Sequence, residues 1–264
     1  MKKLIAMLLA LTMVLAFAGC ATSNGANDTT AANDTTAAPD TTAAPETTAA
    51  PETTAAPAED EVALMTYDEY MAADADDKVC IETYVQATRS WWADTICVYA
   101  QGPDGGYFMY DMACSEEDAA KLVPGTKIRV TGDKAVFDGE IEIMNATFEF
   151  VEGGDTYIPE ALDATELLGT DELEANMNKF ASFEGLTIES ITYKNDEPGD
   201  DIYVTVGYNG ASYDFCVEVY LTGTDSDVYT TIGTLEVGDV VNVEGFLYWY
   251  NGVNTHITAI SLAE

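Results

Sequence analysis

Two segments of the chain, "LVPGTKIRVTG" (residues 122–132) and "LEVGDVVNVEG" (residues 235–245), share one pattern at an offset of 113 residues. The shared positions, extended at the same offset beyond both segments, are Leu122/Leu235, Gly125/Gly238, Ile128/Val241, Val130/Val243, Gly132/Gly245, Gly139/Gly252 and Ala146/Ala259. Seven matches without a gap indicate two copies of one structural unit. Two long copies do not make a solenoid, which needs at least three short repeats.

The first copy has the alternating pattern of strands around this segment. In residues 79–87, apolar and polar side chains alternate, which is typical of a half-buried strand. Further strands are predicted at 95–101, 107–113, 127–131 and 140–151, and "GPDGG" (102–106) makes a turn. A short helix is predicted between the third and fourth strands, where Ser115 and Asp118 resemble a capping box. A second helix, "YDEYMAA", is predicted ahead of the first strand, capped by Thr66 and Glu69.

The order of three strands, one helix and two strands is that of the OB-fold, a five-stranded Greek-key barrel. The predicted fold is therefore all-β with short helices, in two tandem five-stranded OB-fold-like barrels at residues 62–152 and 156–264. The second copy fits this order less well. Its inter-strand segment "TDSDVYTTIG" is rich in Thr and β-branched residues, which predicts a poor helix.

The N-terminal region predicts export from the cytoplasm. Residues 1–19 combine Lys2 and Lys3 with an apolar run from Leu4 to Ala18, which is typical of a secretory signal peptide. The run is shorter than the ~20 residues that span a bilayer. Residues 20–57 contain five hexads of the type "DTTAAP", which have nothing to bury and predict a disordered, extended stalk.

Two stretches resemble known bacterial proteins. "AFAGC", ending at Cys20, resembles the lipobox of bacterial lipoproteins. The resemblance implies cleavage after Gly19 and a diacylglyceryl anchor on Cys20, with fatty acyl chains such as palmitate. An ordinary signal peptide with an incidental cysteine is the alternative.

The folded region carries the second resemblance. "VCIETYVQATRSWW", "YFMYDMACSEEDAAKLVPGTKIRVTG" and "GEIEI" resemble OB-like domains of extracytoplasmic lipoproteins from Gram-positive-type bacteria. Residues 156–264 resemble them more weakly. The two resemblances imply a lipoprotein anchored to the outer face of the cell membrane, and they imply little about its function.

Charge restricts the partners. Residues 58–264 contain 42 acidic and eight basic residues, a formal net charge of −34. Nucleic-acid affinity depends largely on Lys and Arg neutralising phosphates, so this charge disfavours nucleic acid, and it disfavours contact with anionic lipid as well. Neutral glycans, proteins and cations stay open as ligands. Solubility on a crowded cell surface is the simpler explanation of the charge.

The sequence shows no convincing catalytic or metal site. Its one histidine, His256, falls in the last predicted strand opposite Ile143 of the first copy, which predicts a partly buried structural residue. No nucleophile elbow, P-loop or HExxH helix is present. The acidic clusters at 74–77, 195–201 and 225–227 lack the EF-hand spacing. We therefore expect no enzyme activity, cofactor or resident metal.

Four cysteines fall in the folded region. Cys80, Cys97, Cys114 and Cys216 match no disulfide framework. Buried free thiols are the default expectation. A bridge between Cys97 and Cys114 across a hairpin is the alternative.

Aromatic residues supply the candidate binding positions. OB-folds bind oligosaccharides and oligonucleotides on the face of strands two and three and on the flanking loops. Aromatic rings there stack on sugars or bases. The candidates are Trp91, Trp92, Tyr84, Tyr99, Phe108 and Tyr110 in the first copy, and Tyr248, Trp249 and Tyr250 in the second. The alternative is that these rings close barrel ends or join the two copies.

The Trp91–Trp92 pair allows a sharper prediction. Adjacent side chains on an extended chain face opposite ways, so we expect Trp91 to close the barrel end and Trp92 to be exposed. The leading hypothesis is a non-enzymatic surface lipoprotein that binds a glycan or a protein through aromatic loops. A single-stranded nucleic-acid-binding protein and a non-catalytic subunit of an envelope assembly are the alternatives.

Overall fold

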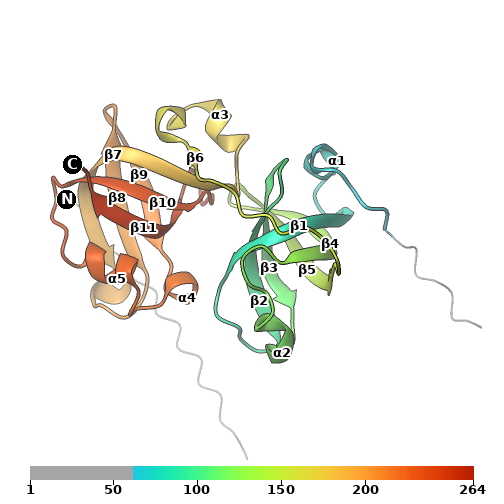
Figure 1. Cartoon of the computed structure of the whole chain (residues 1–264). Coiled ribbons are helices and arrows are strands. Elements are labelled where there is room, and N and C mark those ends of the chain that lie inside the picture. Colours follow the sequence, from blue (N-terminus) through green and yellow to red (C-terminus); the bar gives the residue numbers. More distant parts are fainter. Residues whose placement is uncertain (1–61) are drawn as a thin grey trace, which may run out of the picture. The chain divides into compact units, whose positions relative to one another are not determined.

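The computed structural model describes residues 62–264, all within one unit, Ala56–Glu264. The predicted signal peptide, Cys20 and the stalk to residue 57 lie outside the described residues. Strands make up most of the structure, with a few short helices, so the predicted all-β class is confirmed (Figure 1). In this described part of the chain, no helix has the length and apolar character needed to cross a membrane.

The first five strands form a closed barrel. They are β1 (Lys78–Thr88), β2 (Thr95–Gln101), β3 (Gly106–Ala113), β4 (Lys127–Phe137) and β5 (Glu140–Phe150). They pair in the order β1-β2-β3-β5-β4, and β4 pairs back with β1. Strands β3 and β5 meet in parallel at the pair Met109–Ile143. β4 extends six residues beyond the predicted end at Thr131, because it forms a hairpin with β5 through Asp138 and Gly139.

The later strands repeat this pairing order. They are β6 (Leu162–Asp163), β7 (Phe180–Tyr193), β8 (Ile202–Tyr208), β9 (Ala211–Val217), β10 (Val240–Phe246) and β11 (His256–Leu262). The sheet runs β10-β11-β9-β8-β7-β6, and β10 also pairs with β7. Strands β9 and β11 meet in parallel at Cys216–His256, which corresponds to Met109–Ile143. The 113-residue offset that links Ile143 to His256 is therefore a structural equivalence.

At one repeated position, Gly125 and Gly238, the backbone conformation explains why both residues are glycine. Gly125 and Gly238 have φ values of 86° and 99°, in the left-handed region that glycine adopts without strain. Their N–H groups donate 2.8 Å hydrogen bonds to the carbonyls of Val85 and Ile188, respectively. The same turn thus leads into β4 and into β10.

At a second repeated position, Gly132 and Gly245, glycine is required because a backbone carbonyl of the following strand lies close to the residue. A Cβ at Gly132 would lie 2.7 Å from the Met144 carbonyl oxygen, and a Cβ at Gly245 would lie 2.3 Å from that of His256. Both glycines lie where the ladder with the following strand shifts register. The Ala146/Ala259 match is wrong as an equivalence, because Thr131 pairs with Thr147 whereas its match Glu244 pairs with Ala259, one residue short of the offset. Ala146 is buried and Ala259 is exposed.

The helices are short, and most begin at a capped residue. They are α1 (Tyr67–Ala72), α2 (Glu116–Ala119), α3 (Asp171–Glu174), α4 (Val219–Thr222) and α5 (Asp227–Ile232), with 3-10 turns η1 (Thr165–Leu167) and η2 (Lys194–Asp196). The capping box of Thr66 and Glu69 at α1 is confirmed. The poor helix predicted for the second copy does form as α5. Ser226 caps it and Tyr229 and Ile232 are buried, so packing outweighs weak propensity.

Three apolar clusters organise the molecule. One fills the first barrel, around residues such as Ile81 and Met109, and one fills the second sheet, around Phe183 and Phe215. The third joins the outer face of β2 and β3 to the second sheet: Cys97, Tyr99, Phe108 and Phe246. This third cluster decides which of the candidate aromatic residues meet solvent.

Candidate ligand-binding cleft

The tryptophan pair lies on a tight hairpin between β1 and β2. Trp92 and Thr95 exchange two backbone hydrogen bonds of 3.0 Å. Ala93 and Asp94 between them have φ values of 49° and 63°. Two successive left-handed residues are the geometry of a two-residue type I′ turn. The hairpin is therefore fixed by its own backbone.

The two tryptophans face opposite sides of this hairpin. Trp91 is half-buried against the core of the first barrel, and its Nε1–H donates a 2.8 Å hydrogen bond to the Cys114 carbonyl. Trp92 is 79% exposed. The prediction that Trp92 is the exposed one of the pair is confirmed. Trp91 anchors the hairpin, and Trp92 stays free to contact a ligand.

A cleft of about 360 Å³ lies beside the hairpin. Its aromatic lining comes from Trp91 and Trp92, from Tyr110 of β3 and from Tyr220 of α4. Tyr110 is 37% exposed and Tyr220 is 60% exposed. The backbone N–H of Ser90 donates a 2.7 Å hydrogen bond to the Tyr220 carbonyl, which joins the hairpin to α4. Three exposed rings from separate elements thus surround one opening.

A bulge in β3 directs two neighbouring side chains into this cleft. Tyr110 and Asp111 are consecutive, and both are exposed and line the cleft. In a regular strand they would face opposite sides. Asp111 has a φ of 47°, and the β2–β3 ladder shifts register between Ile96 and Val98. Bulges re-aim side chains in this way and concentrate next to functional sites, as does backbone strain of this kind.

Arg89, which lines the cleft, forms a largely buried ion pair with Glu218. Arg89 Nε lies 3.1 Å from Glu218 Oε2. The contact is electrostatic rather than an aligned hydrogen bond, since neither atom has a partner of good geometry. Burial raises the pKa of the Glu218 carboxyl, and Arg89 opposes that rise. The positive charge of Arg89 is therefore already balanced inside the protein.

Two of the predicted binding residues are covered instead. We expected Tyr99 and Phe108 to face outward on β2 and β3, and both are buried. Tyr99 stacks on Phe246 at a ring distance of 4.7 Å, and its hydroxyl lies 2.6 Å from Nδ1 of His256. The prediction of exposure was wrong because the second sheet packs on this face. The alternative, an interface role, is confirmed for both residues.

The remaining candidates lie outside the cleft. Trp249 is buried in the core of the second sheet, so its prediction as a ligand contact conflicts with its position. Tyr248 is half-buried and stacks on His256 at 4.2 Å. Tyr84 is half-buried beside Tyr157. Tyr250 is 54% exposed, but it lies next to Phe137 at the β4–β5 hairpin.

Tyr220 is the cleft residue that the sequence reasoning missed. It lies in α4, a single turn within "CVEVYLTG", where no aromatic pattern or periodicity marks it. Its pairing with the hairpin through Ser90 spans 130 residues. Only the packing of α4 against the hairpin reveals it.

The thiols and the histidine have structural positions. Cys80, Cys97, Cys114 and Cys216 are free and buried, so the default expectation is confirmed and the Cys97–Cys114 bridge is wrong. Burial raises the pKa of Cys97 to about 11. His256 is buried more deeply than predicted, and burial lowers its pKa well below the usual value. Within residues 62–264, no three His, Cys, Asp or Glu side chains are placed to hold a metal ion.

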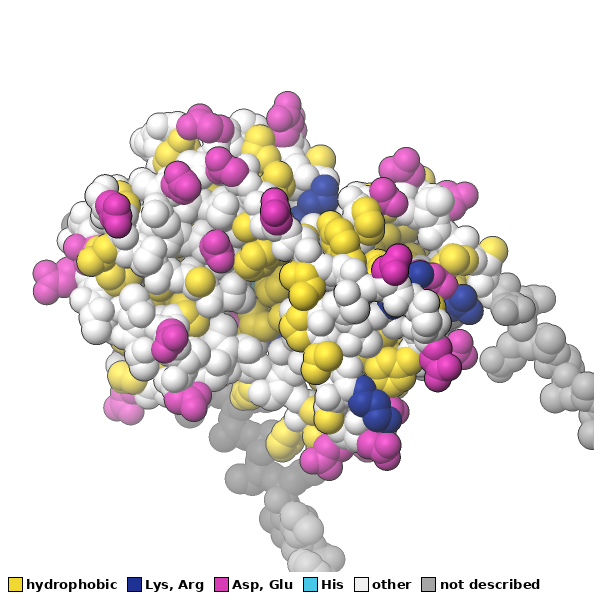
Figure 2. Space-filling model, in the orientation of Figure 1, with side chains coloured by type: hydrophobic (Ala, Val, Ile, Leu, Met, Phe, Trp, Pro, Cys, Tyr) yellow, Lys and Arg dark blue, Asp and Glu magenta, His cyan; other side chains and the backbone are white. Residues whose placement is uncertain are grey.

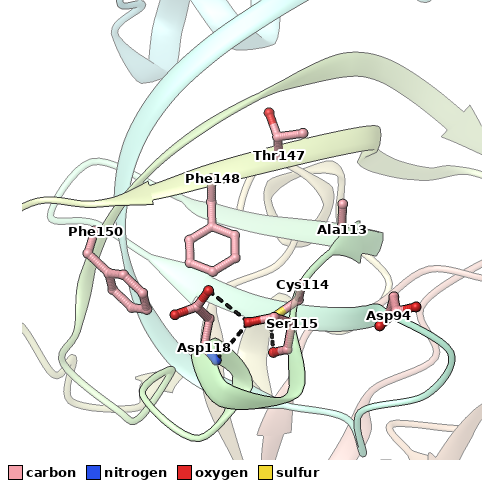
Figure 3. A pocket seen from close by; sticks show the side chains of 8 residues that line it. All are labelled: Asp94, Ala113, Cys114, Ser115, Asp118, Thr147, Phe148 and Phe150. Atoms are coloured by element: carbon pink, nitrogen blue, oxygen red, sulfur yellow. Dashed lines mark hydrogen bonds between the residues drawn. The ribbon is translucent and has the colours of Figure 1, made fainter. Parts of the chain in front are cut away.

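A second hollow lies at the edge of the first barrel. It has a volume of about 460 Å³ and lies between the end of β3 and β5, which diverge beyond the Met109–Ile143 pair. Figure 3 shows Phe148 and Phe150 on one side and Ser115 and Asp118 on the other. The Ser115 hydroxyl bonds to both the carboxylate and the N–H of Asp118, as the N-cap of α2. These two polar side chains therefore cap a helix.

Every basic side chain of the described residues has a partner. Six form ion pairs: Lys78, Arg89, Lys121, Lys127, Arg129 and Lys194. Lys134 donates to three backbone carbonyls at the end of α1, and Lys179 donates to Asn176. Figure 2 shows many acidic and few basic side chains on the visible face. Among residues 62–264, a phosphate would therefore compete with an existing partner for every basic side chain.

Comparisons with known proteins complete the description. No family model and no curated protein matches the chain. Among solved structures, a murine DNA-binding protein bound to double-stranded DNA is 10% identical, with 70% of this chain and 96% of that chain covered and a TM-score of 0.36. The Ifi202 HINa domain with 20bp DNA is 10% identical, with 69% and 92% covered and a TM-score of 0.32.

A replication protein A heterotrimer bound to single-stranded DNA is 12% identical, with 69% of this chain and 50% of that chain covered and a TM-score of 0.28. All three TM-scores are low. The description of the fold therefore rests on the strand pairings themselves, and these similarities carry no argument about function.

Proposed function

We propose that this protein is a non-enzymatic binding protein of the cell surface, and that its ligand occupies the cleft beside Trp92. The main support for this proposal is the exposure of Trp92, which is 79%. The fixed hairpin holds Trp92 next to Tyr110 and Tyr220 around one opening. Exposed rings that gather around a concavity are the usual signature of a ligand site. The ligand class is a glycan or a protein segment outside the cell.

The architecture supports this placement. Both sheets follow the same pairing order, so we interpret them as tandem OB-like barrels. Their resemblance to extracytoplasmic lipoproteins and the lipobox-like "AFAGC" favour a lipid anchor on Cys20 at the outer face of the membrane. The hexad stalk then holds the binding unit away from the bilayer.

The chemistry of the cleft favours binding over catalysis. Its one thiol, Cys97, has a pKa of about 11, so little of it is the nucleophilic thiolate near neutral pH. His256 is buried beneath Tyr99 and does not line the cleft. The carboxylate beside the Cys97 thiol, that of Asp111 at 3.6 Å, raises the pKa of the thiol further, so the pair does not supply the activated nucleophile that covalent catalysis needs.

No observation favours the nucleic-acid alternative. The eight basic residues are committed to other groups, and the β2–β3 face that carries Tyr99 and Phe108 is covered. Binding driven by phosphates is strongest at low salt. A gel shift of single-stranded DNA at about 50 mM salt would revive this alternative, and no shift is expected.

The test is a glycan array and a protein pull-down with the full chain and two variants. Trp92→Ala removes the exposed ring of the cleft, and Tyr250→Ala removes a ring that is similarly exposed outside it. We expect the first substitution to abolish capture and the second to preserve it. Capture that survives Trp92→Ala would contradict the proposed site.

A further inference from the structure

Resting on the proposed function, we propose that the cleft recognises an organic cation, an alkylammonium group carried by the ligand. The observations behind this are the arrangement of the aromatic rings, the placement of one carboxylate and the neutralisation of the local arginine. Each of them concerns residues of the cleft or in direct contact with it.

The rings suit a cation that is weakly hydrated. Trp92, Tyr110 and Tyr220 come from the hairpin, from β3 and from α4, and they meet around an opening of about 360 Å³. Ring faces carry negative quadrupole charge, and cages of several rings are the known solution for ammonium groups. A volume of this size admits a headgroup of a few carbon atoms with its first substituents.

Asp111 supplies the charge. The β3 bulge places it beside Tyr110 on the cleft wall, where a regular strand would turn it away. The Cys97 thiol contacts its carboxylate at 3.6 Å and accepts a 3.4 Å hydrogen bond from its backbone N–H. The side chain is thus held in place, and Asp111 is an exposed residue of the cleft lining.

Arg89 also lines the cleft, and its ion pair with Glu218 balances its positive charge. Glu142 of β5 is buried nearby, and burial raises the pKa of its carboxyl, while Arg89 opposes that rise and Asp111 adds to it. The net charge of −34 over residues 58–264 attracts cations from a distance and repels anionic ligands.

A matched pair of probes tests the inference. Choline and its uncharged isostere 3,3-dimethylbutan-1-ol have the same shape and differ in charge. We expect choline to change the tryptophan fluorescence of the full chain saturably, and the isostere to bind about tenfold more weakly or worse. A chito-oligosaccharide serves as the neutral glycan probe.

Two isosteric variants sharpen the test. Asp111→Asn keeps the size and tolerates the left-handed backbone, so we expect a folded protein whose choline affinity falls about tenfold while the weak binding of the isostere is unchanged. Asp138→Asn is the control, because Asp138 has a similar φ of 48° in a hairpin outside the cleft. Its choline affinity should match the wild type.

The outcomes separate the two proposals. Equal binding of choline and the isostere, or unchanged affinity in Asp111→Asn, overturns the cation inference. Oligosaccharide binding that Trp92→Ala abolishes, with no response to choline, overturns the inference and leaves the proposed binding function standing. Absence of any Trp92-dependent binding in both these titrations and the array overturns both.

Discussion

Aromatic residues lie both on the covered face of the first barrel and in the open cleft beside it. They are buried on the covered face and exposed in the cleft. Tyr99 and Phe108 lie on β2 and β3 and are buried under the second sheet. Trp92 and Tyr110 lie on the same hairpins and are exposed. The difference shows that the segment packed against an outward-facing aromatic residue decides whether that residue is buried or exposed. The predictions below test that contrast.

The largest effect is expected at the covered face. Phe108→Ala removes a fully buried ring between the two sheets and should lower the free energy of unfolding by about 3–5 kcal/mol. The matched control is Tyr110→Ala, two positions along β3 and exposed, which should cost less than about 1 kcal/mol. Urea denaturation of both variants measures this. Similar losses in the two would show that the face is not buried as described.

The junction should also respond to pH through Glu140. Its carboxyl is fully buried, Oε2 accepts a 2.8 Å hydrogen bond from the backbone N–H of Trp249, and burial raises its pKa to about 8. Desolvation of the buried carboxyl is the largest influence, and it outweighs the opposing effects of the Trp249 backbone N–H and the Asn178 side chain, which lower this pKa. The unfolded carboxyl titrates near ~4.3, so the native state holds one more proton between these values.

Stability should therefore fall as pH rises from about 4.5 to about 8, by up to ~1.4 kcal/mol per pH unit from this group. Glu140→Gln keeps the shape and removes the titration, and we expect the variant to be more stable than the wild type at pH 8 and to show a flatter profile. Glu149, exposed on β5, provides the control substitution Glu149→Gln. An identical slope in Glu140→Gln and the wild type would disprove the buried acid.

A smaller effect is expected at the turn of the tryptophan hairpin. Ala93 has a φ of 49°, which costs an alanine more than an asparagine. Ala93→Asn should therefore raise the free energy of unfolding by about 0.5–1 kcal/mol. Ala120, with a φ of −65°, is the control position where Asn should bring no gain. Thermal denaturation distinguishes them, and destabilisation by Ala93→Asn would argue against the type I′ turn.

The smallest effect on stability is expected at the open cleft itself. Trp92→Ala removes an exposed ring and should change the free energy of unfolding by less than about 0.5 kcal/mol. Trp91→Ala should cost several times more, because it removes core packing and the hydrogen bond to Cys114. If Trp92→Ala destabilised the protein as much as Trp91→Ala, the exposed ring would have a structural role.

Much of the fold followed from local sequence signals. The alternation at 79–87, the turn "GPDGG" and the capping residue Thr66 predicted elements that the structure contains, because neighbours along the chain determine them. The repeated glycines at 125 and 238 predicted equivalent turns for the same reason. The helix α5 was harder to predict, because its stability comes from the burial of Tyr229 rather than from the helix propensity of its residues.

Only part of the candidate ligand-binding cleft could be predicted from the sequence. The exposure of Trp92 could be predicted because adjacent side chains on an extended chain face opposite sides, which involves only Trp91 and Trp92. The burial of Tyr99 depends on Phe246, 147 residues away, and no local pattern reports that contact. The bulge at Asp111 and the approach of Tyr220 likewise arise from packing between distant segments. Aromatic candidates could be collected from the sequence, but tertiary contacts decided which of them line the cleft.

The central claim is that ligand binds at Trp92, and the three tryptophan indole N–H signals in a ¹⁵N–¹H NMR spectrum of the full chain test it most directly. Trp92→Phe and Trp249→Phe assign the signals. On addition of choline, or of a ligand captured in the array, the Trp92 signal should shift saturably while that of the buried Trp249 stays unchanged. A saturable shift of Trp249 with an unmoved Trp92 would contradict the account.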